Sequence, residues 1–443
     1  MKYKKRVYLL GCILTILAVA GCRATEKSDI KSVNGFYVSE FVGETDENPT
    51  IPEDVVEDVP ADIALQENEL YIGADQDAKT ESERSKILDT LQKAGKASAS
   101  EVKKEEKELK IKKSAHYYYY TLSNDQKAVY RSILKGLANR EDGFSVNVTR
   151  DNLYDAFCRV IYDHPELFWA ELNYRYWDYG SYVFIRPQYN RTKEQIATDK
   201  KAVNKAVRII IKKASQKKSK YDKVLYVYKH LIDSIDYKLD AKDNQNVYSS
   251  LVSKKTVCAG YAKATQLLLQ KMGIQCLYVL GNTNRGYHAW NIVKLGDQYY
   301  QMDTCWGDPN YTNSNADYLR NLPKALRYDY RYYCIDDSTM FKSRSQDNHL
   351  GLPACRDMSK SFYIYNKRYF TSYGDQVKNS IKSNIRNGKN YWQGQMANKE
   401  AYLSLLQAVK NGLYPQYLYD IKGKSVYAYY VYYDDQNIIQ LYY

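Results

Sequence analysis

Apolar side chains recur at helical spacing in several stretches of the chain. Residues three or four positions apart are apolar in the segments 117–137, 153–162, 193–213, 221–234 and 258–273. This spacing is typical of helices with one buried face. In 193–213, lysines stand opposite the apolar stripe. That helix is expected to expose a solvated face, with binding of a polyanion as the alternative.

Alternating patterns predict strands between and after these helices. Aromatic residues alternate up to about residue 184, and 275–280 predict a strand that is followed by a polar loop at 281–287. The last part of the chain predicts a strand, two helices (378–386 and 398–411) and a closing hairpin.

The mixture of helices and antiparallel strands predicts an α+β fold class. In its core, the helix that begins near residue 258 is expected to pack on an antiparallel sheet. A mainly helical, tyrosine-rich region precedes this core, and a small α/β unit follows it. At 443 residues the chain is long enough for two or three folded units. The expected segments are 1–21, 22–115, 116–192, 193–358 and 359–443.

The first segment has the pattern of an export signal. Four basic residues within positions 2–6 precede a fourteen-residue apolar stretch, 7–20, which is short for a membrane-spanning helix. The stretch ends in VAGC at Cys22 and resembles the lipobox of bacterial lipoproteins. The resemblance implies that 1–21 is removed, that Cys22 is lipidated, and that the body lies on the extracytoplasmic face of a bacterial membrane. An uncleaved anchor helix and a plain secretory signal are the alternatives.

Charge is distributed unevenly along the chain. The net charge is +13, yet residues 26–84 carry seventeen acidic and four basic side chains. With few aromatic residues, this stretch is expected to be a disordered tether, and the Lys/Glu-rich stretch 85–113 a solvated, partly helical spacer. The body beyond it is therefore strongly basic. Export argues against nucleic acid as its partner, which leaves anionic lipids or wall polymers open.

Composition excludes some further classes of protein. A mean hydropathy of −0.63 excludes a polytopic membrane protein. Tyrosine is abundant, at 48 residues against 9 phenylalanines, but it marks the folded body and carries little chemistry. The chain has no CxxC, HExxH, GxSxG or glycine-rich phosphate loop, so neither a metal nor a cofactor is expected.

Candidate chemistry gathers between residues 244 and 309. Cys258 falls at the start of a predicted helix, where unpaired N–H groups favour a thiolate and could hold an oxyanion. A hairpin with the two-residue turn Gly296-Asp297 is expected after it. Its register places Trp290 opposite Asp303, so that His288 and Asp303 are diagonal neighbours. A nucleophile and a His–Asp pair suit thiol acyl transfer.

Three blocks in this stretch carry a family resemblance. VCAGYA at 257–262, HAWN at 288–291 and DTCWGDP at 303–309 resemble the transglutaminase-like superfamily, whose core is a papain-like cysteine-peptidase fold. The resemblance is strong over about 195–310. It implies that Cys258 is the nucleophile, that His288 is the general base and then the acid, and that Asp303 orients the imidazole.

Several positions stay open at this level. Cys305 stands where the family commonly has Thr, and the hairpin register places it opposite His288, either as a free thiol or in a disulfide. Trp290 is expected in the core or in the cleft wall. Asn246 and Tyr248 are candidates for the oxyanion partner, although a structural role suits both. Apart from Cys258, the cysteines after Cys22 are expected to be separate buried residues.

The predicted function is that of a surface lipoprotein that acts on peptide or amide bonds through a thioester. Its substrate is expected to be a protein or peptide, with cell-wall peptides included. Hydrolysis and transfer to an amine both fit, and hydrolysis is favoured because nothing indicates an amine site. The alternative is a catalytically silent scaffold that binds wall polymer or protein.

Overall fold

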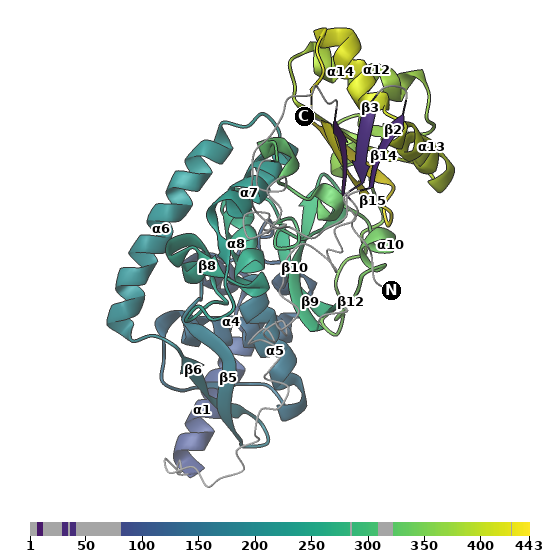
Figure 1. Ribbon diagram of the computed structural model, residues 1–443. Helices are drawn as coiled ribbons and strands as arrows, with labels where there is room; N and C mark the ends of the chain where they lie inside the picture. Colours follow the sequence, from purple (N-terminus) through teal and green to yellow (C-terminus); the bar gives the residue numbers. More distant parts are fainter. Residues whose placement is uncertain are drawn as a thin grey trace. The chain divides into compact units, whose positions relative to one another are not determined.

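The computed structural model describes residues 7–11, 29–33, 36–40, 81–283, 286–308, 322–426 and 428–443 (Figure 1). The chain divides into two compact units. The larger unit comprises 54–307 and 332–358, and the smaller unit comprises 1–53, 308–331 and 359–443. Cys22 and most of the predicted signal and tether lie outside the described residues. The five predicted segments stay a prediction.

The larger unit is built around a four-stranded antiparallel sheet. Its strand order is β11-β10-β9-β12, with the bounds β9 Cys276–Thr283, β10 Gly286–Leu295, β11 Gln298–Met302 and β12 Arg344–Gln346. Helix α8, Cys258–Lys271, packs on β9 and β10. Beside it lie α7, Lys220–Ser234, and the long helix α6, Lys193–Ser215 (Figure 1).

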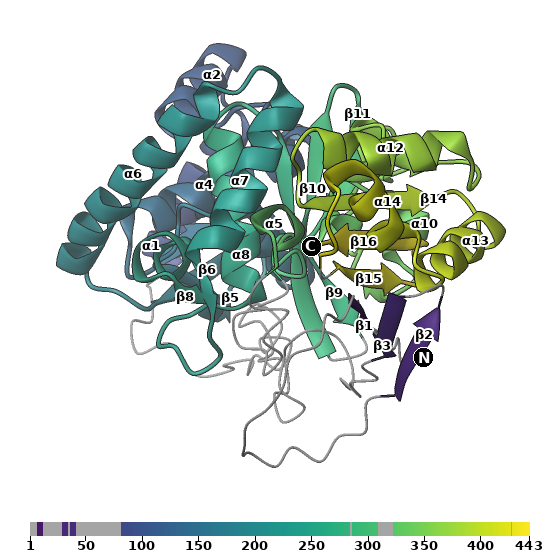
Figure 2. The ribbon, with the colours of Figure 1, turned by 45° about the horizontal axis from the view of Figure 1, so that its top comes forward.

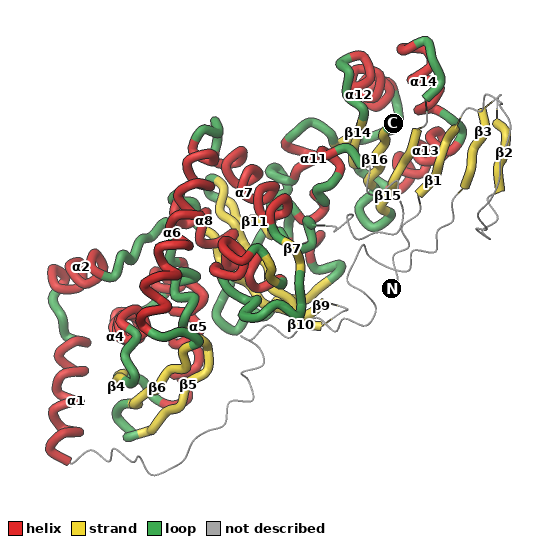
Figure 3. Tube along the Cα trace, turned by 60° about the vertical axis from the view of Figure 1, so that its left-hand side comes forward, coloured by secondary structure: helices red, strands yellow, loops and turns green. Residues whose placement is uncertain are grey.

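A second layer of the larger unit precedes these helices in the chain. Helices α3 (Tyr117–Thr121), α4 (Asn124–Asn139) and α5 (Arg150–Asp163) pack together. Helices α4 and α5 lie beside a three-stranded sheet of order β4-β6-β5 (Figure 3), with the bounds β4 Phe144–Val146, β5 Ala170–Asp178 and β6 Val183–Tyr189.

The Lys/Glu-rich stretch forms two helices, α1 (Glu81–Gly95) and α2 (Ala99–Glu108). Helix α2 is docked on the body: Glu105 lies 2.5 Å from the Nε of Arg131, and Glu106 accepts a 2.7 Å hydrogen bond from Tyr119. The stretch is helical as expected and α2 has no buried residue, but two of its acids pair with buried groups of the body, so the helix is docked as well as solvated.

The smaller unit contains a seven-stranded sheet of order β13-β14-β16-β15-β1-β3-β2. Helices α12, α13 and α14 pack together and on this sheet (Figure 2). The bounds are β1 Val7–Gly11, β2 Asp29–Val33, β3 Phe36–Glu40, β13 Tyr369–Phe370, β14 Tyr391–Met396, β15 Ala428–Tyr433, β16 Ile438–Tyr442, α12 Asp375–Arg386, α13 Lys399–Lys410 and α14 Leu413–Lys422.

The predicted α+β class is confirmed, with differences at particular elements. The expected polar loop at 281–287 is partly strand, since β9 continues to Thr283 and β10 begins at Gly286. Helix α14 was not predicted because Pro415 interrupts its pattern; the proline lies in the first turn, where a helix tolerates it. No helix among the described residues is both long and apolar enough to cross a membrane.

Gly260 allows α8 to start close to the segment before it. A Cβ at this position would collide with Oγ1 of Thr256 and lie 2.7 Å from Oγ of Ser250, and both of these residues are buried. The Gly of the VCAGYA block therefore permits a close approach of chain segments at the start of the helix.

Replacing Gly260 should destabilise the larger unit. Gly260→Ala is expected to cost about 1–3 kcal/mol through overpacking, seen as a lower midpoint for that unit in denaturant unfolding. Gly374→Ala is the control, because its Cβ would meet only Oγ of Ser372, at 3.9 Å. Equal midpoints for the two variants would contradict the packing role of Gly260.

Candidate active site

Cys258 is the first residue of α8 and is 1% exposed. Val257 before it is extended and provides no side-chain cap for the helix. The first N–H groups of a helix have no partners within it and lie at the positive end of its dipole, so this position favours an anion. The helix begins where the apolar pattern predicted.

Hydrogen bonds fix α8 against the sheet. The side-chain amide of Asn291, on β10, donates to the carbonyl of Ala262 in α8 (3.0 Å) and to that of Leu277 in β9 (3.1 Å). Thr265 of α8 also bonds Thr304, 3.0 Å away. These contacts hold the helix that carries Cys258 in register with the strand that carries His288.

His288 and Asp303 form a fully buried pair. Nε2 of His288 lies 2.8 Å from Oδ2 of Asp303, and both residues are 0% exposed. The predicted register is confirmed from Leu295↔Gln298 to Asn291↔Met302, where the ladder ends.

A turn, rather than the expected continuation of the strand, brings Asp303 to His288. Its N–H donates to the carbonyl of Tyr332 (2.9 Å), and its Oδ1 accepts the backbone N–H of Trp306 (2.9 Å). The predicted pairing of Trp290 with Asp303 and of His288 with Cys305 is therefore wrong. The chain bends after Met302, where the Asp303 carboxylate caps its own turn.

The pKa values of the pair shift in the sense of an ion pair. Burial alone would lower the pKa of His288, but the charge and hydrogen bond of Asp303, with a further contribution from Cys258, raise it to about 10. Burial would raise the pKa of Asp303, but His288 and Arg344 together lower it to about 2. The contribution of Cys258 to this shift indicates that the thiol lies near the ring.

Arg344, the first residue of β12, makes a second contact with the carboxylate. Its Nη1 donates to Oδ2 of Asp303, the oxygen that also binds His288, and both side chains are 0% exposed. The guanidinium is enclosed by three aromatic rings, at 4.1 Å from Trp306, 5.0 Å from Tyr332 and 5.3 Å from Trp290. Its Nη2 is buried with no hydrogen-bond partner among the described residues.

Three of the four residues of this site lie in a part of the sequence that matches a known family. The family model of the transglutaminase-like superfamily matches residues 207–304. Residues 207–304 form a transglutaminase-like domain. The domain includes Cys258, His288 and Asp303 and ends before Arg344, so no motif of the matched region pointed to the arginine.

Solved structures are similar to part of the chain. A crystal structure of a TGase is 14% identical, with a TM-score of 0.23, and covers 30% of this chain and 44% of that chain. A candidate cysteine protease from Cytophaga hutchinsonii is 13% identical, with a TM-score of 0.22, and covers 30% and 61%. The chain thus spans less than two thirds of either protein. No curated protein matches it significantly.

The other predicted positions around the transglutaminase-like domain have structural contacts. Trp290 is a core residue, 1% exposed, and its Nε1 donates to Gln301 (2.7 Å). Cys305 is buried in the turn after β11 and forms no disulfide with another described residue. The absence of a disulfide also holds for further described cysteines that are buried: Cys158, Cys276, Cys334 and Cys355.

Asn246 and Tyr248, the oxyanion candidates, lie in the segment before α8. The side-chain amide of Asn246 donates to Oδ1 of Asp243 (2.6 Å), and its oxygen accepts the backbone N–H groups of Tyr248 and Ser249. The ring of Tyr248 lies under the Arg191 guanidinium, at 5.0 Å. Both side chains therefore have structural contacts, and their oxyanion role stays a prediction.

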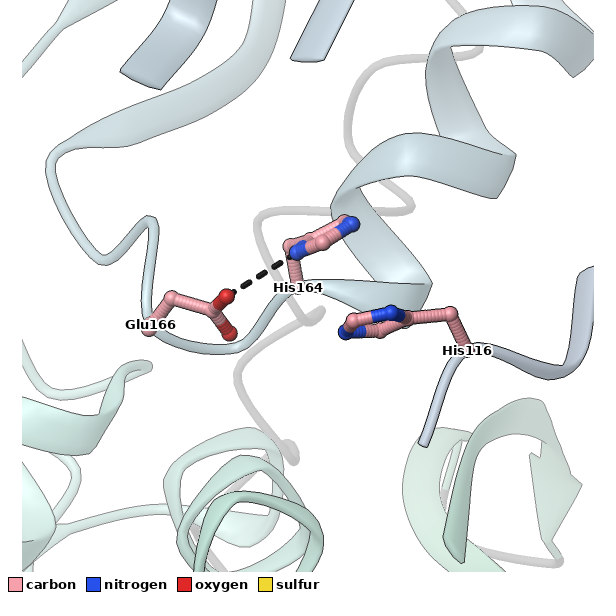
Figure 4. A group of neighbouring side chains, drawn as sticks. All are labelled: His116, His164 and Glu166. Atoms are coloured by element: carbon pink, nitrogen blue, oxygen red, sulfur yellow. Dashed lines mark hydrogen bonds and ion pairs between the residues drawn. The ribbon is translucent and has the colours of Figure 1, made fainter. Parts of the chain in front are cut away.

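Among the described residues, one further cluster combines types of metal ligand. The ligand atoms of His116, His164 and Glu166 lie within 4.8 Å of one another (Figure 4). However, Nδ1 of His116 accepts the backbone N–H of Lys112 (3.0 Å), which leaves the proton of the neutral ring on Nε2. The two imidazoles also stack, with centroids 4.2 Å apart and ring planes 28° apart, so their in-plane lone pairs lie in separate planes. The proximity of His164 and Glu166 is explained by the hydrogen bond between them (2.9 Å), and we assign no metal to the cluster.

Asp303→Asn should lower the pKa of His288, because the variant loses the negative charge that stabilises the imidazolium. In the wild type, this stabilisation is fully present below the unfolded histidine pKa and is lost as pH rises through about 10. In Asp303→Asn, His288 should lose its proton at a lower pH than in the wild type. NMR titration of labelled histidines measures the shift.

Asp347→Asn provides the matched control for this titration. The hydrogen bond that the His349 imidazole donates to Asp347 raises the pKa of His349, so this variant should move the titration of His349 and leave that of His288 in place. An unchanged His288 titration in Asp303→Asn would contradict the ion pair.

Proposed function

We propose that the transglutaminase-like domain is a thiol enzyme that acts on peptide or side-chain amide bonds through a thioester. The observation that carries the proposal is the buried His288–Asp303 pair, with Cys258 near this pair at the start of α8. Nucleophile, base and orienting carboxylate in this order are the parts that acyl transfer requires.

The geometry suggests a role for each atom. Nε2 of His288 is engaged by Asp303, so Nδ1 is the nitrogen left to take the proton of the thiol. The sulfur attacks the carbonyl carbon, and the first N–H groups of α8 stabilise the oxyanion. His288 then protonates the departing amine as the C–N bond breaks, which leaves a thioester on Cys258.

The second half-reaction determines the class of enzyme. With water as acceptor, the thioester yields a free acid and the protein is a peptidase or amidase. With a primary amine, it yields a new amide and the protein is a cross-linking transglutaminase. We favour hydrolysis of a peptide or protein, because no motif in the sequence indicates a site for an amine acceptor.

A glutamine-containing peptide and a fluorescent primary amine, incubated with the full chain, should distinguish these outcomes. Hydrolysis releases a free acid, whereas transfer incorporates the label. Cys258→Ala should reduce either product by about 10³-fold or more, and Cys276→Ala, a buried cysteine on β9, should retain activity. If no peptide tested gives a product, the alternative of a binding scaffold is favoured.

We propose further that lipidation of Cys22 anchors the protein on the extracytoplasmic face of a membrane. The support is the sequence pattern of a basic start, a fourteen-residue apolar stretch and VAGC. Two or three acyl chains on one residue give stable anchoring, whereas a single chain is marginal.

Cys22→Ala should move the protein out of the membrane fraction and remove the mass of the acyl chains. Fractionation of the native host and mass spectrometry of the N-terminus measure the two effects. Cys158→Ala, a change far along the chain, is the control. Unchanged fractionation and mass in Cys22→Ala would overturn the anchor.

A further inference from the structure

Four buried groups from four different elements form one charge cluster. Cys258 comes from α8, His288 from β10, Asp303 from the turn after β11, and Arg344 from β12. The titratable and charged groups that act most strongly on His288 are Asp303 and Cys258, and those that act most strongly on Asp303 are His288 and Arg344. Their exposed fractions are between 0% and 1% for Cys258, His288 and Asp303, and the Arg344 side chain is 0% exposed.

A cluster buried this deeply must be close to neutral, because an uncompensated charge away from water is costly. The guanidinium is a permanent cation and balances the carboxylate to which it is bonded. The thiol and imidazole can then be neutral together or form a thiolate–imidazolium pair. Transfer of the proton from the sulfur to the imidazole nitrogen converts the first form into the second and leaves the total charge of the cluster unchanged.

Without the positive charge of Arg344, the same burial would favour a different protonation state of Cys258 and His288. The negative Asp303 would be balanced only if His288 were protonated while Cys258 kept its own proton. The cluster would then hold one more proton at a given pH, and the nucleophilic sulfur would form only at higher pH. The single positive charge is therefore coupled to the protonation of the whole group.

We propose that Arg344 is a positioning residue of the active site, whose charge sets the pH range in which Cys258 is nucleophilic. It acts on the carboxylate through Nη1, and on the reacting sulfur only through Asp303 and His288. Trp306, Tyr332 and Trp290 exclude water from the guanidinium, which preserves the strength of its charge. The inference rests on the proposed thiol chemistry and identifies what regulates it.

The test compares two substitutions that differ in charge. Gln at position 344 can still donate a hydrogen bond to Asp303 but is neutral, whereas Lys keeps the positive charge. The rate of Cys258 alkylation by iodoacetamide is measured from pH 4 to 10 in the full chain, with the modified peptide identified by mass spectrometry. The readout is the pH of half-maximal rate, because a change in accessibility scales the rate equally at every pH.

Arg344→Gln should raise this midpoint by about one to three pH units, so that alkylation slows about tenfold per unit on the acid side. Arg344→Lys should return the midpoint most of the way to the wild-type value. Circular dichroism and the unfolding midpoint establish that both variants are folded. A variant that unfolds is replaced by Arg344→Met, which fills the aromatic enclosure.

Three outcomes decide between the hypotheses. Equal midpoints in the wild type and Arg344→Gln would overturn the role of Arg344 while leaving the thiol chemistry intact. Midpoints that shift equally in the Gln and Lys variants would also overturn it, because a structural effect does not depend on charge. A wild-type Cys258 that titrates like a thiol in an unstructured peptide would overturn the proposed function itself.

Discussion

The carboxylate of Asp303 joins the parts of the larger unit that meet at the candidate site. One oxygen receives His288 from β10 and Arg344 from β12, and the other receives the N–H of Trp306. The backbone N–H of Asp303 donates to the carbonyl of Tyr332, which is the first residue of the second segment of this unit, 332–358. Removing the anion would leave the buried guanidinium of Arg344 without a counter-charge and His288 without its hydrogen-bond partner, so the local fold and the proposed chemistry depend on the same charge.

Hydrogen bonds place the helix of Cys258 more specifically than apolar packing could. The amide of Asn291 reaches one carbonyl on α8 and one on β9, and Thr265 bonds Thr304 in the turn. An apolar helix face can slide or rotate at little cost, whereas a buried amide that loses its acceptor pays the full desolvation penalty. The HAWN block thus supplies both the imidazole and the group that fixes the helix of Cys258.

Sequence patterns predicted the features that depend on residues close together in the chain. Helical periodicity located α8 with Cys258 at its start, and the two-residue turn set the β10–β11 register. The approach of Asp303 to His288 was also predicted, but through a continued strand where the chain makes a turn. Arg344 could not be predicted, since it lies 41 residues from Asp303 in a weakly periodic stretch, and only tertiary structure brings the two together.

The enclosure of Cys258, 1% exposed, has a kinetic consequence. For the proposed chemistry, a peptide would reach the sulfur only after part of the surrounding structure opens, and turnover would then be the rate of the open form multiplied by its population. If about one molecule in a hundred is open, turnover is about a hundredfold below the intrinsic rate. The same equilibrium shields the thiol from oxidants, and any partner that favours the open form would act as an activator without touching the chemistry.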